Sequence, residues 1–332
     1  MKPNNVFNDT IGQETAVIQL SESIASAANG GEMASPLLSQ EAGGGKTHLQ
    51  RRYLQGLEKE GIATLFFSSP EEFRTQGANF DKIVQLVTSG ERYAIGIDEA
   101  HLFHHRPTVQ MEKVFAFVMK ALDRNNHHRS FNFDGQTLVN FNRKLGSISF
   151  ATNFPDALDK SGALQSRFDK IELKPYSEEE LVQILQIMLK DAGFQAASEK
   201  TLGKIARCGR GTARPMEKII GQIAMSRSAS GETRKTINCD DVCNALKLKQ
   251  MFPRGLTPDE VQMLIVCETP RRDSVIAAFL PQMERNIMKK AKGFLMLNGF
   301  AEQTPQGFCT TPTGNAYIAQ LKKEGFKFDK TA

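Results

Sequence analysis

The sequence predicts a protein of the α/β class, in which a parallel sheet covered by helices is followed by two smaller parts. Short apolar runs alternate with helix-like stretches in the first half, as in a parallel sheet covered on both faces. After Pro175 the apolar residues recur at helical spacing, and Pro253 and Gly255 then mark a linker. At 332 residues the chain exceeds one ordinary core, so we expect two or three domains.

Five apolar runs in the first half have the character of buried strands. They are Pro36–Leu38, Ala63–Ser68, Tyr93–Ile97, Ser147–Ala151 and Lys170–Leu173. Because parallel strands covered on both faces are apolar at nearly every position, we predict that these five form one parallel sheet within residues 1–176.

The next part of the chain has the pattern of a helical domain. Ser177 and Glu180 form a capping box, which marks the start of a helix. Apolar residues then recur at helical spacing, at Leu181, Ile184, Leu185 and Met188. Further helix-like segments begin near Glu199, Ala213 and Asp240, and the last of them ends near Met251. We predict a helical domain over residues 177–252.

The final part has three helix-like segments followed by a hairpin. The segments are Pro258–Cys267, Asp273–Leu280 and Arg285–Asn298, and the hairpin lies around Thr304–Gly307. This order of elements is typical of a winged helix. We therefore predict a winged-helix domain over residues 253–332.

The composition restricts the class of protein. Apolar residues at 40% and charged residues at 24% are typical of a soluble globular chain rather than a disordered one. The apolar stretches are shorter than the roughly 20 residues of a membrane helix, and the N-terminus lacks the apolar core of a signal peptide. We therefore expect a cytoplasmic protein without membrane association. The net charge of +5 allows nucleic-acid binding without requiring it.

The cysteines and histidines do not form the pattern of a metal site. The five cysteines are an odd number late in the chain, which is unlike a secreted disulfide framework and fits a reducing compartment. Cys239 and Cys243 lie in a helix-like pattern, and no second Cys or His pair follows at ligand spacing, so we expect structural cysteines. The histidines form two groups, one of His101, His104 and His105 and one of His127 and His128. For both groups we favour a solvated surface or contacts with a partner over a metal site.

A glycine-rich segment indicates a nucleotide site. Residues 40–47, QEAGGGKT, follow a short strand and run into a helix-like stretch that begins at His48. Such a loop lets backbone N–H groups surround phosphates at a helix N-terminus, where Lys46 would meet the β- and γ-phosphates and Thr47 would hold Mg²⁺. The residues of this candidate ATP site are Gly43, Gly44, Gly45, Lys46, Thr47 and His48.

One residue departs from the phosphate-loop pattern G-x-x-x-x-G-K-[ST], because Gln40 occupies the position of its first glycine. The segment could instead be a flexible turn beside a surface lysine. A third interpretation is a nucleotide-binding protein that hydrolyses ATP poorly because Gln40 distorts the loop. The three consecutive glycines at 43–45 count against this distortion, since they supply backbone freedom.

A second motif strengthens the nucleotide site. Residues 93–101, YAIGIDEAH, form an apolar strand that ends in two carboxylates, about 50 residues after Lys46. Asp98 would bind the Mg²⁺ shell through water, and Glu99 would orient and polarise the attacking water, because phosphoryl transfer depends on positioning and charge neutralisation. Acidic residues also end strands at surface turns, but the order and spacing relative to Lys46 and Thr47 favour this Walker B interpretation.

Several separated segments resemble the RuvB family, whose members are AAA+ motors that drive Holliday-junction branch migration, over nearly the whole chain. The segments are NDTIGQ at 8–13, ATN at 151–153, LQSRF at 164–168 and RGTAR at 210–214, together with the two motifs above. The resemblance implies an AAA+ P-loop core, an α-helical lid and a C-terminal winged-helix domain, with ATP and Mg²⁺ as cofactors.

The resemblance also implies roles for single residues. Ile11 would lie beside the adenine, and Asn153, with Thr152 beside it, would sense the γ-phosphate or help to place water. Arg167 would be the arginine finger that reaches the ATP of a neighbouring subunit, and Arg214 would reach the nucleotide from the lid. A site completed by a neighbour requires head-to-tail subunits, which close into a homo-oligomeric ring, and the family implies a hexamer. Taken singly, either arginine could be a solvated charge or a surface ion pair.

A hairpin is predicted between the Walker B and sensor segments. Residues 128–141 contain Asp134 and Gly135 between alternating apolar residues, which is a strong hairpin signal. In the RuvB family a hairpin inserted here binds the partner RuvA, which implies an equivalent contact at Arg129–Phe141. The candidate contact residues are Phe131, Phe133, Leu138 and Phe141. Packing of these side chains on the hairpin's own core is an equally supported alternative.

The C-terminal part could bind DNA. Its basic residues, including Arg271, Arg272 and Arg285, could neutralise phosphates without reading bases. From Arg254 onward there are 11 Lys and Arg against 8 Asp and Glu, an excess of three, so a solvated basic face is the alternative. The family's wing carries arginines around its Thr-Pro-x-Gly turn, where this chain has Gln306 and Phe308.

The leading hypothesis is a RuvB-like, Mg²⁺- and ATP-dependent hydrolase of the helicase or translocase type, which moves duplex or branched DNA and drives branch migration in recombination and repair. The alternative is a loading or assembly factor that uses ATP to recruit a partner onto DNA. The altered phosphate loop and the wing without arginines motivate this alternative.

Overall fold

The computed structural model describes residues 5–73, 78–104, 107–122, 129–133, 136–141, 145–158 and 165–326. The chain divides into two compact units, Met1–Tyr176 and Ser177–Ala332. The predicted division into three domains, at 1–176, 177–252 and 253–332, stays a prediction.

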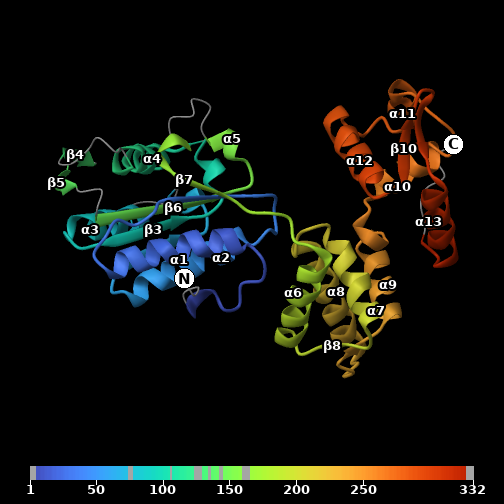
Figure 1. Cartoon of the computed structure of the whole chain (residues 1–332), viewed down its shortest axis with the longest axis horizontal. Helices are drawn as coiled ribbons and strands as arrows, with labels where there is room; N and C mark the ends of the chain where they lie inside the picture. Colours follow the sequence, from blue (N-terminus) through green and yellow to red (C-terminus); the bar gives the residue numbers. More distant parts are fainter. Residues whose placement is uncertain are drawn as a thin grey trace. The chain divides into compact units, whose positions relative to one another are not determined.

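The first unit is built on a sheet with helices on both sides (Figure 1). The sheet has five strands in the order β2-β3-β6-β1-β7, and all neighbouring strands are parallel. The strands are β1 Pro36–Ser39, β2 Ala63–Phe67, β3 Tyr93–Ile97, β6 Gly146–Thr152 and β7 Asp169–Glu172. All five predicted strands are confirmed, and no end differs from its prediction by more than one residue.

Helices cover both faces of this sheet, as the sequence predicts. The helices of the first unit are α1 Glu14–Ala28, α2 Lys46–Lys59, α3 Ala78–Thr88, α4 Val109–Ala121 and the short α5 Pro155–Leu158. Successive residues of a strand point to opposite faces, so Leu37 of β1 packs with residues of α3 and α4, whereas Leu38 packs with residues of α1 and α2. This alternation produces two separate cores on one sheet.

The predicted hairpin is present as an antiparallel pair, β4 Arg129–Phe133 and β5 Gln136–Phe141, inserted between α4 and β6. The turn residues Asp134 and Gly135 lie outside the described residues, and so do the side chains proposed to contact a partner. Those side chains are Phe131, Phe133, Leu138 and Phe141. Their role therefore stays a prediction.

The second unit begins with a bundle of helices. Its first helix, α6 Glu178–Asp191, starts with the predicted capping box, in which Glu180 N donates to Ser177 Oγ and Ser177 N donates to Glu180 Oε2. The helices that follow are α7 Glu199–Ala206, α8 Arg214–Ser230 and α9 Cys239–Leu248, with two short parallel strands, β8 Gln195–Ala196 and β9 Thr236–Ile237. The predicted run of helices is confirmed.

The rest of the second unit contains the three further helices and the hairpin that were predicted. These are α10 Pro258–Val266, α11 Asp273–Phe279, α12 Arg285–Leu297, and β10 Ala301–Thr304 paired with β11 Gly307–Thr310. Sequence reasoning missed the last helix, α13 Pro312–Lys323, although Thr311 at its N-cap and Pro312 at its first position are a recognisable start signal. Its assignment as a winged helix stays a prediction.

The cysteines are all free thiols. Burial raises the pKa of Cys208 to about 11 and that of Cys267 to about 12, so both thiols are protonated and unreactive at neutral pH. In the described part of the chain, no three or more His, Cys, Asp or Glu side chains gather as a metal cluster would. No helix among the described residues is long and apolar enough to cross a membrane.

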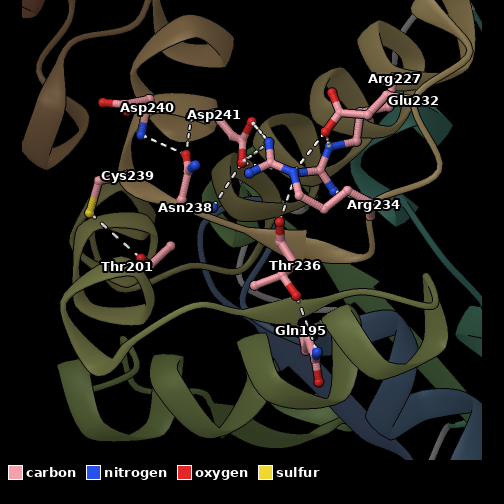
Figure 2. Close-up of polar contacts among 10 residues, drawn as sticks. All are labelled: Gln195, Thr201, Arg227, Glu232, Arg234, Thr236, Asn238, Cys239, Asp240 and Asp241. Atoms are coloured by element: carbon pink, nitrogen blue, oxygen red, sulfur yellow. Dashed lines mark hydrogen bonds and ion pairs between the residues drawn. The ribbon is translucent and has the colours of Figure 1, made fainter.

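A buried arginine holds the end of α8 to the start of α9 (Figure 2). The Arg227 side chain is 5% exposed and donates to the backbone oxygens of Arg234 and Thr236 and, at 2.8 Å, to Asp241 Oδ2. Asp241 also accepts at the N-terminus of α9, where Asn238 N donates to it at 2.8 Å. One guanidinium therefore satisfies two carbonyl groups and the carboxylate that caps the next helix.

We expect Arg227→Met to lower the free energy of unfolding by about 3–5 kcal/mol, because it breaks a buried ion pair to Asp241 and leaves two backbone carbonyl groups without this donor. Urea unfolding followed by circular dichroism measures the change. The control is Arg234→Met, which removes a second ion pair to Asp241 from a side chain that is 44% exposed and should change stability little. Equal losses in the two variants would contradict the central role of Arg227.

Candidate active site

Three loops meet at one edge of the sheet because β3, β6 and β1 are adjacent and parallel. In the register of the sheet, Ser39 at the end of β1 pairs with Thr152 at the end of β6. Ligands of open α/β sheets bind outside the carboxyl ends of the strands. The phosphate loop, the two carboxylates and the sensor segment are thus brought together, although about 110 residues separate the first from the last.

The phosphate loop is shaped by glycines and leads directly into a helix. Gly43 and Gly45 have φ of 89° and 87°, in the left-handed region that other residues rarely adopt. Helix α2 begins at Lys46, and Gly45 at its N-cap has no side chain to bond the first N–H groups. A helix N-terminus in this state is suited to bind an anion such as a phosphate.

Lys46 is buried and reaches the sensor segment. Its ammonium group donates to the Gln40 and Glu41 carbonyl oxygens at 2.9 and 3.0 Å, and to Asn153 Oδ1 at 2.7 Å. Asn153 follows the last residue of β6, and its Nδ2 donates to Glu99 Oε2 at 2.9 Å. Asn153 therefore bridges the cation and the carboxylate that were predicted to take part in hydrolysis.

The remaining predicted residues extend this network. Thr47 Oγ1 donates to Asp98 Oδ2, and Asp98 Oδ1 accepts from Glu99 N at 2.7 Å. Glu99 has φ of 49°, an uncommon conformation for a residue other than glycine, and such conformations cluster at functional sites. Thr47, Asp98, Glu99, Asn153 and Lys46 thus form one connected chain of hydrogen bonds.

This donor set fits the predicted ligands. A hydroxyl and a carboxylate in contact are hard oxygen ligands of the kind that Mg²⁺ takes in small number while it keeps water and phosphate oxygens. The Lys46 ammonium and the start of α2 provide positive charge for phosphates. The side chains therefore fit both ATP and Mg²⁺, and their assignment to these ligands remains a proposal.

His101 is a residue of this site that the sequence interpretation placed elsewhere. Its side chain is 16% exposed, and Nδ1 lies 3.5 Å from Glu99 Oε2 and 3.3 Å from Thr152 Oγ1. The ring also packs edge-on against Phe154. Its position two residues after the second carboxylate, on a turn that must pass the same edge of the sheet, was a signal that could have identified it. His104 lies 2.6 Å from the Leu158 backbone oxygen, while His105, His127 and His128 lie outside the described residues.

The N-terminal segment packs beside the start of α2. Thr10 Oγ1 and Asp9 Oδ1 lie 3.3 and 3.6 Å from His48 Nε2. Gln13 Nε2 donates to the Lys174 oxygen and its Oε1 accepts from Lys174 N, which joins the segment to the end of β7. Ile11 is half-buried between these attachments.

The environment of His48 favours its neutral form. Burial lowers the pKa of the ring and outweighs the opposing effect of Asp9, and Arg52 lowers this pKa further by a smaller amount. His48 is therefore neutral at pH 7 beside the candidate phosphate site.

The two predicted arginines lie in different units. Arg167 ends the 3₁₀ turn Gln165–Arg167 directly before β7, next to Phe168, whose ring packs 4.8 Å from that of Phe150. Arg214 is the first residue of α8 in the second unit. The roles of both residues toward the nucleotide stay predictions.

The structure explains how the loop accommodates Gln40. A Cβ atom at Gly44 would lie 1.4 Å from Gln40 Oε1 and 2.1 Å from Gln40 Cδ, so the glutamine side chain occupies the space that a side chain at position 44 would need. Gln40 Oε1 is buried without a hydrogen-bond partner. The absence of a side chain at position 44 therefore leaves room for Gln40, which stands where the phosphate-loop pattern has its first glycine.

The solved structures that resemble this chain define its fold, whereas no family model matches the sequence. The fold is of the AAA+ class: the AAA domain of FIGL-1, in complex with ADP, has a TM-score of 0.53 and 18% identity over 74% of this chain and 85% of that chain. Over nearly its whole length the fold is that of RuvB. Thermotoga maritima RuvB, described as a Holliday junction branch migration motor, has a TM-score of 0.61 and 21% identity over 96% of this chain and 98% of that one.

A point mutant of the same RuvB gives a TM-score of 0.62 and 21% identity, covering 96% of this chain and 99% of its own. The agreement extends across both units of the chain. At these identities the likeness establishes the fold, and it agrees with the RuvB-like AAA+ architecture predicted from the sequence.

We expect Gly44→Ala to weaken ATP binding about fivefold, because the new Cβ must displace the flexible end of Gln40, which costs about 1 kcal/mol, the low end of overpacking. The double variant Gln40→Gly/Gly44→Ala should recover most of the affinity, since it removes the side chain that the new Cβ would meet. Titration with a fluorescent ATP analogue measures both, and Gly221→Ala, where a Cβ meets no atom within 4 Å, is the control. An equal loss in both backgrounds would contradict the coupling of positions 40 and 44.

Proposed function

We propose that this protein is an ATP hydrolase that works as a RuvB-like motor on DNA. The single observation that carries the catalytic part is the hydrogen-bonded chain from Thr47 through Asp98, Glu99 and Asn153 to Lys46. It joins a phosphate-binding loop, a pair of carboxylates and a polar sensor at one edge of an AAA+ sheet. Each of these groups has a distinct task in phosphoryl transfer.

Lys46 and the start of α2 bind the phosphates in this proposal. To do so, the Lys46 ammonium exchanges its bonds to the Gln40 and Glu41 carbonyl oxygens for bonds to phosphate oxygens. Thr47 and Asp98 hold Mg²⁺, which supplies charge neutralisation when bound. The short bond between these two side chains keeps their oxygens together at the correct end of α2.

Glu99 orients the attacking water and accepts its proton. Its carboxylate is held by Asn153 Nδ2 at 2.9 Å, so the position of the base depends on the residue that also contacts Lys46. His101, 3.5 Å from the same carboxylate oxygen, restricts it from the other side. Thr152, Asn153 and His101 thus position the base with respect to the phosphates.

The proposed motor is a homo-oligomeric ring, a hexamer by its likeness to the RuvB family. In such a ring Arg167 completes the site of a neighbouring subunit, and Arg214 contacts the nucleotide from the helical lid. Ile11 and His48 contribute to the nucleotide pocket, where the half-buried Ile11 would face the adenine. The hairpin Arg129–Phe141 is the proposed contact for a RuvA-like partner, and the protein is expected in the cytoplasm.

We assign the DNA contact chiefly to α12. Its exposed residues include Arg285, Lys289 and Lys290. Lys292, in contrast, is 8% exposed and paired with Asp273, so it does not add to the basic face. These contacts would be made to phosphates and would give salt-sensitive binding without sequence preference. The substrate in this proposal is duplex or branched DNA in recombination and repair, as for the Holliday junction motor of Thermotoga maritima.

The second candidate is a loading or assembly factor that uses ATP to recruit a partner onto DNA. The hairpin after α12 favours it, because Phe308 is completely buried and Gln306 is uncharged, so the hairpin tip provides no cation there. ATP-driven movement of a four-way junction would exclude this candidate. ATP-dependent recruitment of a partner without strand movement would support it.

The variants Lys46→Ala and Glu99→Gln should each lower kcat for ATP by about 100-fold or more. They differ in binding: Lys46→Ala loses affinity for the nucleotide, whereas Glu99→Gln retains it because the phosphate contacts remain. Steady-state ATPase activity and analogue titration measure the two effects, and Glu112→Gln on the exposed side of α4 is the matched control. If both variants kept full activity, the catalytic assignment would be wrong.

Arg167→Ala should abolish DNA-stimulated ATPase activity when all subunits carry it. Mixing this variant with Glu99→Gln should restore part of the activity, since an Arg167→Ala subunit keeps its carboxylate and can receive Arg167 from a Glu99→Gln neighbour. ATPase assays across mixing ratios, with four-way-junction DNA, measure the recovery. If the ATPase activity of every mixture equalled the sum of the two inactive variants measured separately, the site would not be shared between subunits.

A further inference from the structure

Arg210 lies in a tight bend immediately before Arg214. The 3₁₀ turn Arg207–Gly209 ends there, and Arg210 adopts φ of 50°, a left-handed conformation that is uncommon for a residue with a side chain. Four residues later Arg214 begins α8. The conformation directs the Arg210 side chain toward the C-terminal helices of the second unit, as its contacts demonstrate.

The Arg210 guanidinium contacts three separate elements. Its Cζ lies 3.4 Å from the centre of the Phe294 ring on α12. Nη1 donates to Glu260 Oε2 on α10 at 2.9 Å and to the Gly255 oxygen at 3.3 Å. The Glu260 side chain is only 6% exposed and also accepts from Thr257 N, so Arg210 is the cation that balances a buried carboxylate.

The backbone around Arg210 fits closely as well. A Cβ atom at Gly255 would lie 2.6 Å from the Cys208 oxygen and 2.9 Å from Arg210 Cγ. The turn that carries Arg210 therefore packs directly on the linker before α10. Such a dense contact transmits a displacement instead of absorbing it.

We propose that Arg210 couples nucleotide binding to DNA binding. It is a positioning residue that makes the turn before Arg214 and the basic helix α12 move together. This inference rests on the proposed function, because it takes Arg214 to contact nucleotide and α12 to contact DNA. Phe294 follows Lys290 by four residues on α12, so Arg210 contacts this helix one turn after the exposed Lys290. A shift of Arg214 on nucleotide binding then reaches α12 through one planar side chain.

The guanidinium is specifically required. Its plane stacks on the aromatic ring while its N–H groups bond to the carboxylate, which an ammonium group on a flexible stem does not reproduce. Arg210→Lys keeps the charge beside Glu260 and loses the stacking. Phe294→Leu removes the ring and leaves the ion pair in place. These two variants separate the coupling contact from the electrostatic requirement of folding.

Coupling between two ligands is reciprocal and is measured as a ratio of affinities. For the full-length chain, the affinity for fluorescent duplex DNA is measured by anisotropy with a non-hydrolysable ATP analogue and with ADP. The wild type should show a ratio in the usual range of coupling, about 5- to 150-fold. In Arg210→Ala, Arg210→Lys and Phe294→Leu the ratio should fall toward one, and stimulation of the ATPase by DNA should be lost, whereas ATPase activity without DNA should persist.

The matched control is Arg207→Ala. Arg207 lies in the same turn, but its side chain is 52% exposed and pairs with Glu178 of α6. Its removal should leave the ratio unchanged. Thermal unfolding of every variant identifies any that fails to fold, and Phe294→Leu is the most conservative of the set because it keeps Glu260 paired.

The possible outcomes separate the two proposals. A wild type that lacks ATPase activity or DNA binding overturns the proposed function, and the coupling falls with it. The other case is a wild type that is active and binds DNA with an affinity that depends on the nucleotide. If the folded Arg210 and Phe294 variants then keep the same ratio of DNA affinities, the coupling alone is overturned. Loss of the ratio in Arg207→Ala to the same extent also overturns it.

Discussion

The candidate site depends on the parallel pairing of β6 between β1 and β3. This pairing places the phosphate loop, the two carboxylates and Asn153 at the ends of three adjacent strands. Asn153 can then accept from Lys46 through its amide oxygen and donate to Glu99 through its amide nitrogen at the same time. A change in the position of any one of the three strands would separate the base, the cation or the sensor. The two apolar cores on either face of the sheet hold the strands in this order.

The phosphate loop accommodates a glutamine at the position where the motif has its first glycine. The side chain of Gln40 occupies the space that a side chain at position 44 would need, and Gly44 has no side chain to compete for it. The glycines at 43 and 45 still provide the left-handed conformations that lead into α2.

Two arginines, the buried Arg227 and the partly exposed Arg210, connect helices of the second unit. Arg227 joins the end of α8 to α9, and Arg210 joins the start of α8 to α10 and α12. In both cases a planar guanidinium bonds a carboxylate that itself caps a helix, Asp241 in the first and Glu260 in the second. Charge-assisted hydrogen bonds thus connect the end of α8, and the turn that precedes α8, to the neighbouring helices. Such contacts are directional, so they define how one helix lies against the next more narrowly than apolar packing alone.

The sequence by itself determined the local elements of this protein, and the tertiary structure decided which distant residues meet. The strands, the capping box at Ser177 and the loop before Lys46 follow from apolar patterns and residue types, because these act within a few residues. The sequence also identified Lys46, Asp98, Glu99 and Asn153, whose contacts then proved mutual. The contact of Arg210 with Phe294 could not be predicted in this way. It is set by the packing of separate helices, which no local pattern encodes.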